Sequence, residues 1–153
     1  MNEEIIQALA KDLKISADQV RSVLSMLEEG NTPEDMIRRV LEIAEKDSPI
    51  HVYPVGAVTK GQMGEEMTDI AGMVKAGAKA ISEDGKSVMN AELYREAMRE
   101  AVKADIPVMA HCEDRNMVGK GAMNAGGKAD ELGIQGITNA VEDIIAVRDI
   151  LLA

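Results

Sequence analysis

The sequence contains no tryptophan and no phenylalanine, and tyrosine occurs only twice among its 153 residues. A core built around large aromatic rings is therefore excluded, and aliphatic side chains must fill the interior. The eleven methionines are the other apolar supply, and we expect most of them to lie in the core. A chain of this length matches one ordinary domain and can bury roughly two thirds of the surface that it exposes when unfolded.

Cysteine and histidine are almost as scarce, with Cys112 as the one cysteine and His51 and His111 as the only histidines. A single cysteine excludes an internal disulfide, which fits a reducing compartment. The opening MNEEIIQALAKDLK carries early acidic residues and lacks the apolar stretch of a signal peptide. No apolar run approaches the length of a membrane span, so we expect a soluble, cytoplasmic protein.

Positive charge is also in short supply, because 17 lysines and arginines face 27 aspartates and glutamates, giving a net charge of −10. This surplus of negative charge disfavours contact with nucleic acid phosphates and with anionic membranes. We therefore expect neither a nucleic acid nor a membrane surface among the partners of this protein.

Apolar residues recur at helical spacing in the first part of the chain, which predicts helices near 3–12, 17–29 and 33–46. Thr32 fits the N-cap of the third helix, and Pro33 fits its first turn. The first two helices would form a helical hairpin over residues 1–30, ahead of the rest of the fold.

After Pro49 the pattern changes to short apolar runs, each followed by a turn and a helical segment. The expected strands are 50–55, 78–81 and 107–110. The expected helices lie near 64–76, 90–104 and 138–152, the last of them after a loop that runs to about residue 136. This alternation predicts an α/β fold of three consecutive βα units, with parallel strands and right-handed crossovers, preceded by the N-terminal helical segment.

Two polar clusters follow the second and third predicted strands, Ser82-Glu83-Asp84-Gly85 and His111-Cys112-Glu113-Asp114. Because the carboxyl ends of adjacent parallel strands meet at one edge of a sheet, we expect Asp84 and His111 to lie within side-chain reach. A carboxylate and an imidazole can ligate one divalent metal such as zinc, although catalytic zinc typically takes three protein ligands. The alternatives are an ordinary Asp-Gly turn and a hydrogen-bonded loop histidine.

Other polar residues near these clusters receive simpler interpretations. Glu83 and Asp114 are interpreted as solvated loop charges. Cys112 is interpreted as a small buried residue, because neighbours on a strand point to opposite sides and His111 could not activate it. His51 is expected to face solvent or to pack. The glycine-rich stretch 119–127 lacks the context of a phosphate-binding loop, and is either a flexible loop beside the site or a plain surface loop.

Several of these motifs occur together in a known family. The strings are VYPVGAVTKGQMGEEMTDIAGMVKAGAKAISEDGKSVMNAELYREAM, IPVMAHCED, GAMNAGGKADELGI and ITNAVEDIIAVRDILLA. In order and spacing they resemble the middle of the class I bacterial dihydroorotases, in the amidohydrolase superfamily, over residues ~50–153 with a weaker extension back to Asn31. The resemblance implies a segment of a TIM barrel that uses zinc to interconvert N-carbamoyl-L-aspartate and dihydroorotate in pyrimidine biosynthesis. Carried over by position, it implies that Asp84 and His111 are metal ligands.

The sequence also departs from that family. The H-x-H-x-R motif of the family's first strand does not occur here, and the further histidine ligand and the catalytic aspartate of the family would lie beyond Ala153. The chain would span about three of the eight βα units of such a barrel. We therefore expect a dihydroorotase-like fragment that is inactive alone, with no catalytic or substrate-binding residue assigned and with zinc binding left open.

Residues 1–30 resemble the opening helices of Tex-type transcription accessory proteins, which implies a junction near Asn31 between domains 1–30 and 31–153. One alternative function is a recombined or engineered chimeric fold without catalysis. Another is a protein-binding module that acts through the N-terminal helices. Three strands taken from a barrel leave open edges and an apolar face, so we expect a homodimer that covers them.

Overall fold

The computed structural model describes residues 3, 6–7, 10–11, 16–18, 20–21 and 32–153. The helices predicted at 3–12 and 17–29, and with them the hairpin of residues 1–30, lie in large part outside the described residues. The residues of this segment that are described are helical apart from Ser16, and Ile6, Ala10 and Val20 pack against one another.

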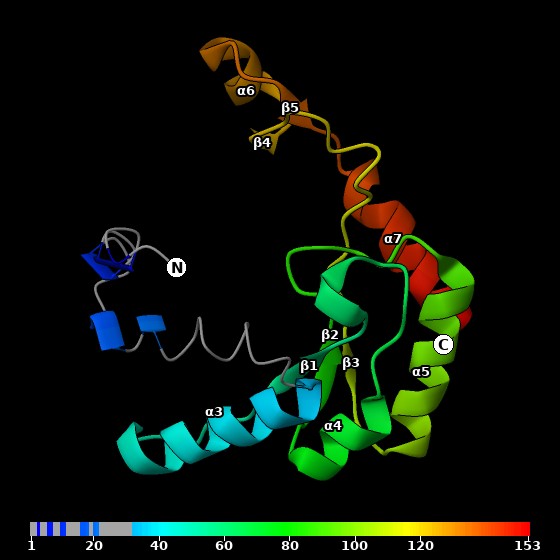
Figure 1. The fold of residues 1–153 in the computed structure, drawn as a ribbon. Coiled ribbons are helices and arrows are strands. Elements are labelled where there is room, and N and C mark those ends of the chain that lie inside the picture. Colours follow the sequence, from blue (N-terminus) through cyan, green and yellow to red (C-terminus); the bar gives the residue numbers. More distant parts are fainter. Residues whose placement is uncertain (1–2, 4–5, 8–9, 12–15, 19, 22–31) are drawn as a thin grey trace.

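A parallel three-stranded sheet forms the centre of the fold, in the order β1 (Val55–Ala57), β2 (Ala80–Ser82) and β3 (Val108–Met109). Each strand leads to a helix, namely α4 (Ile70–Ala76), α5 (Ala91–Lys103) and α7 (Ala140–Leu152) (Figure 1). Helix α3 (Pro33–Asp47) precedes the sheet, and α3, α4, α5 and α7 pack in a row, each against the next. The predicted α/β architecture with three consecutive βα units is confirmed.

Local capping explains why α3 begins where the sequence predicts. The Thr32 hydroxyl accepts a hydrogen bond from the Asp35 N–H at 3.3 Å, and the Asp35 carboxylate accepts one from the Thr32 N–H at 3.2 Å. This reciprocal pair is a capping box, which satisfies two donors that a helix start leaves free. The helix stops at Asp47, and Pro49 follows directly after the Ser48 cap.

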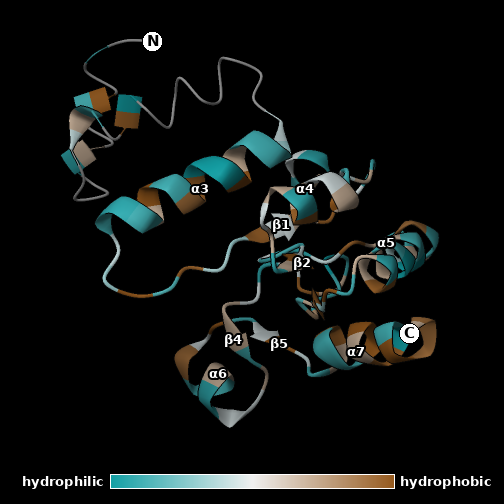
Figure 2. Cartoon of the chain, turned by 90° about the horizontal axis from the view of Figure 1, so that it is seen from below, coloured by the Kyte–Doolittle hydropathy of each residue, from teal (hydrophilic) through white to brown (hydrophobic). Residues whose placement is uncertain are grey.

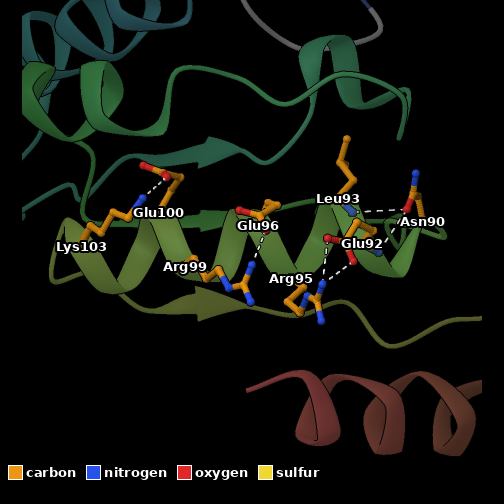
Figure 3. Close-up of polar contacts among 8 residues, drawn as sticks. All are labelled: Asn90, Glu92, Leu93, Arg95, Glu96, Arg99, Glu100 and Lys103. Atoms are coloured by element: carbon orange, nitrogen blue, oxygen red, sulfur yellow. Dashed lines mark hydrogen bonds and ion pairs between the residues drawn. The ribbon is translucent and has the colours of Figure 1, made fainter.

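Helix α5 is also set by local chemistry. The Asn90 side chain accepts hydrogen bonds from the N–H groups of Glu92 and Leu93, at 3.1 and 3.2 Å. Figure 3 shows this cap and the three ion pairs along the solvent face, Glu92–Arg95, Glu96–Arg99 and Glu100–Lys103. Exposed ion pairs of this kind add little to stability, so the helix owes its place mainly to its buried face, Tyr94, Ala97 and Ala101.

The first predicted βα unit is displaced along the chain. Strand β1 begins at Val55, at the end of the predicted 50–55 run, because Pro49 and Pro54 have no N–H to donate to a neighbouring strand. Ile50 and Tyr53 are exposed, and the His51 ring stacks on the Tyr53 ring with 6.4 Å between centroids, so His51 faces solvent as expected. The following helix begins at Ile70 rather than near residue 64.

Residues 59–67 form a separate loop in place of the first turns of that helix. The loop contains a short 3₁₀ helix, Lys60–Gln62, and an antiparallel bridge between Thr59 and Met67. Helix α4 can start only after it, where the Asp69 carboxylate caps the Gly72 N–H at 2.9 Å.

The stretch predicted as a long loop after β3 contains structure of its own. A second, two-stranded parallel sheet joins β4 (Met123–Asn124) to β5 (Gly136–Ile137) through α6 (Gly127–Leu132). It extends away from the main sheet (Figure 1). Both readings of residues 119–127 as an irregular loop were therefore wrong in part. Two-residue strands leave too little periodicity in the sequence to be recognised.

The core lies between the sheet and helices α3, α4 and α5. Its buried members are Ile37, Val58, Ile70, Met73, Ala78, Ile81, Val88, Tyr94, Ala97 and Ala101. The expectation that methionine fills the core was wrong for the described residues. Met73 is the one fully buried methionine among them, whereas Met63, Met109 and Met117 are exposed.

Helix α7 is largely apolar and is drawn mostly in brown in Figure 2. One side of it is exposed. Its exposed members are Ile144, Val147, Ile150 and Leu151. The expected homodimer would cover such a face, and it stays a prediction. Among the described residues, no helix is long and apolar enough to cross a membrane.

Gly136 offers a test of the small β4–β5 sheet. A Cβ at this position would lie 2.3 Å from the Ala125 Cα, so Gly136→Ala should push the two strands apart and cost about 1–3 kcal/mol of local stability. The Ala125 N–H, which donates to the Ile137 carbonyl at 2.8 Å, should then exchange with solvent faster. Gly127→Ala is the matched control, because a Cβ there meets no atom within 4 Å. Wild-type exchange at Ala125 in Gly136→Ala would contradict the described pairing.

Candidate functional site

The carboxyl ends of β2 and β3 place the two predicted polar clusters at the same edge of the sheet. Ser82 pairs with Met109, so Asp84 and His111 each lie two residues beyond a paired position. The Ser87 hydroxyl donates to the His111 carbonyl and accepts from the Glu113 N–H at 3.0 Å. The turn after β2 is thereby bonded to the segment after β3.

Asp84 lies in the turn that follows β2. The Lys86 N–H donates to the Glu83 carbonyl at 2.8 Å, and Gly85 has a φ of +72°, a conformation that glycine adopts without strain. The Asp-Gly turn anticipated as the simpler interpretation is therefore present. The Asp84 side chain is exposed and borders a cavity of about 390 Å³, whose other lining residues are Val55, Ala57, Gln62, Ser82 and Met109.

His111 is half-buried and borders a different crevice, which Ser87, Tyr94 and Arg148 also line. Asp84 and His111 thus share an edge of the sheet but not a cavity. In the part of the chain that the structure describes, no three His, Cys, Asp or Glu side chains are gathered so as to hold a metal. Catalytic zinc needs three such ligands, so the described residues do not complete a zinc site, and the two candidate ligands stay predictions.

The interpretation of Glu83 as a solvated loop charge was wrong. Glu83 is 3% exposed and its carboxylate accepts hydrogen bonds from the Thr59 N–H, at 3.0 Å, and from the Thr59 hydroxyl. Thr59 is itself fully buried, and its hydroxyl oxygen accepts from the Gly64 N–H at 2.8 Å. No local pattern around Glu83 signals this burial, because it depends on a residue 24 positions away.

Asp114 and Cys112 lie in the segment after β3, and both are half-buried. The Asp114 carboxylate accepts from the Asn116 N–H at 2.9 Å in an exposed turn. Burial, followed by the charges of Asp149 and Glu142, raises the pKa of the Cys112 thiol. A raised pKa keeps the thiol protonated and disfavours a nucleophilic role. Cys112 was expected to be buried, and it is half-buried.

A buried polar cluster on α7 was missed by sequence reasoning. Asp149 is 8% exposed and forms an ion pair with Arg148 at 2.7 Å. Arg148 also donates to the Val88 carbonyl at 2.8 Å, and its guanidinium carbon lies 5.3 Å from the centre of the Tyr94 ring. An Arg-Asp pair inside an apolar helix is the signal that could have revealed it.

Comparison with known proteins gives a consistent result. A protein-family model described as "Dihydro-orotase-like" matches residues 18–153. A dihydroorotase of Solibacter usitatus is 44% identical over 114 residues, which cover 74% of this chain and 26% of that protein. A dihydroorotase of Caldicellulosiruptor saccharolyticus is 45% identical over 126 residues, 80% of this chain and 29% of that protein. These matches give no support to the resemblance of residues 1–30 to Tex-type proteins.

Tyr94 carries a pH-dependent part of the stability. Burial, and then the negative charge of Asp149, raises the pKa of Tyr94 from 10.0 to about 12. The folded state therefore favours the neutral phenol, and this contribution is present below pH 10 and lost as the pH rises to about 12. Between pH 10 and 12, we expect the unfolding free energy of the wild-type chain to fall by roughly 2–3 kcal/mol more than that of Tyr94→Phe. Urea titrations at successive pH values measure both curves. Parallel curves for the two proteins would contradict this.

Proposed function

The chain belongs to the dihydro-orotase-like family, and on that premise we propose that it forms one part of a zinc-dependent dihydroorotase-like domain in which Asp84 and His111 are metal ligands. The reaction of such a domain is the reversible cyclisation of N-carbamoyl-L-aspartate to dihydroorotate. The family match over residues 18–153 carries the proposal.

The placement of the two side chains supports this assignment. Asp84 and His111 follow adjacent parallel strands at the carboxyl edge, where barrels of this architecture carry their chemistry. The cavity of about 390 Å³ beside Asp84 opens at this edge. Hydrogen bonds through Ser87 tie the two ligand-bearing segments together, so each could be held while further ligands are supplied from elsewhere.

We further propose that the 153-residue chain does not catalyse the reaction by itself. It spans about a quarter of the length of the curated relatives it matches, 26% and 29% for the two described above. Two ligands leave a zinc ion without the third protein group that fixes a reactive water. The proposed role is therefore a contribution of ligands to a larger site.

Turnover is the first test. With purified 153-residue chain and added zinc, we expect no interconversion of N-carbamoyl-L-aspartate and dihydroorotate above the uncatalysed rate, measured by chromatography of both compounds. The reason is the incomplete first coordination shell. Zinc-dependent turnover that is lost in His111→Ala would overturn the proposed inactivity while keeping the assignment of the ligand.

Zinc affinity is the second test, and it addresses the ligands directly. We expect weak zinc binding to the chain, weakened further by on the order of 10–100-fold in Asp84→Asn and in His111→Ala, since each substitution removes a ligand. The measurement is competition against a zinc-binding dye. His51→Ala is the matched control, because His51 is the only other histidine and is exposed beside Tyr53. Equal affinity in the wild-type chain and in His111→Ala would remove the ligand assignment.

A further inference from the structure

Glu83 and Thr59 form a buried contact that links the turn after β2 to the loop of residues 59–67. Both are nearly or fully inaccessible to solvent, at 3% and 0% exposed. The Glu83 carboxylate accepts both the N–H and the hydroxyl of Thr59, and the Gly64 N–H extends the chain of hydrogen bonds into the loop. A buried carboxylate is costly unless it is hydrogen-bonded, so this contact holds the loop against the turn.

Asp84 follows Glu83 in the chain, and its backbone carbonyl is hydrogen-bonded by the same loop, residues 59–67. The Gln62 side chain donates to the Asp84 carbonyl at 3.2 Å, and the Lys86 ammonium donates back to the Gln62 carbonyl at 2.9 Å. The Asp84 carboxylate accepts no hydrogen bond and forms no ion pair with the described part of the chain. Its position is therefore set by the contacts of its backbone.

Gln62 holds its place in an unfavourable conformation. Its φ is +54°, a left-handed value that residues other than glycine seldom adopt. Such a conformation persists only where surrounding contacts determine it, and it is common beside functional sites. Here the surrounding contacts are the Gln62 N–H, which donates to the Thr59 carbonyl at 3.0 Å, and the bonds with Asp84 and Lys86. Gln62 also lines the same cavity as Asp84.

We propose that residues 59–67 are a positioning element for the Asp84 carboxylate, with Gln62 as the residue in contact and with the Glu83–Thr59 pair as its buried anchor. This proposal rests on the proposed role of Asp84 as a metal ligand. Glu83 and Thr59 are positioning residues, because they act through the turn and the loop and not on the metal. A free carboxylate held in this way is available to a cation without first having to break a bond to the protein.

Thr59→Val tests the anchor, because it keeps the shape of the side chain and removes the hydroxyl. We expect the amides of Gly64 and Lys86 to exchange about five- to tenfold faster, while the Tyr94 amide in α5 keeps its wild-type rate. Thr59→Ser, which restores the hydroxyl, should return both rates to wild type. Thr138→Val is the matched control, since Thr138 is exposed, lies outside the loop and also loses a hydroxyl, which accepts from the Ala140 N–H at 3.4 Å. Equal acceleration at Tyr94 would indicate general destabilisation and overturn the positioning role.

The second measurement is the zinc dissociation constant of each variant. In Thr59→Val the zinc dissociation constant should rise in the same direction as in Asp84→Asn, by on the order of tenfold, and Thr59→Ser should restore it. If zinc binding in the wild-type chain does not depend on Asp84, the proposed function fails at this ligand. Exchange at Lys86 then decides separately whether the loop holds the turn.

Gln62→Ala tests the same positioning role if Thr59→Val does not fold. Gln62 is only half-buried, and its substitution removes the single bond to the Asp84 carbonyl. The Lys86 amide should again exchange faster, with weaker zinc binding. Wild-type exchange and wild-type zinc affinity in Gln62→Ala would overturn the positioning role of the loop.

Discussion

The pairing of β2 with a parallel strand on each side is the constraint on which the other features depend. β2 is buried along its whole length, and its last residue, Ser82, pairs with Ala57 of β1 and with Met109 of β3. Because all three strands run in the same direction, the segments that follow them leave the sheet at one edge. A shift of one residue in this register would turn each side chain to the opposite face. The common placement of Asp84 and His111 follows from the register.

Buried polar contacts collect near this edge, while the rest of the core is apolar. Glu83 is satisfied by Thr59 from the loop after β1, and Arg148 from α7 reaches the Val88 carbonyl beyond the turn after β2. Contacts of this kind are strong only in a particular geometry, because a buried charge without its partner is strongly destabilising. They therefore restrict the positions of the loops and of α7 relative to the sheet more strictly than apolar packing would.

The chain matches only part of the length of its relatives, and several faces of its fold are exposed. The chain matches 26–29% of the length of the dihydroorotases described above. Strands β1 and β3 are the edges of the sheet, and α7 has exposed apolar residues opposite its buried ones. A helix that is apolar on both sides is normally covered on both. The edge that carries Asp84 and His111 is thus formed, whereas other faces of the fold have no neighbour within the described chain.

The sequence by itself determined the features that depend on near neighbours. Thr32 with Pro33 set the start of α3, apolar periodicity placed a helix near 90–104, and the strand-helix alternation indicated the parallel α/β arrangement. Capping and periodicity act over a few residues. The motifs around Asp84 and His111 were also sufficient to indicate the family. Tertiary structure alone decided the burial of Glu83, the β4–β5 pairing and the separation of Asp84 and His111 into different cavities. Each of these depends on atoms that are distant in sequence and meet only when the chain has folded, so no local pattern records them.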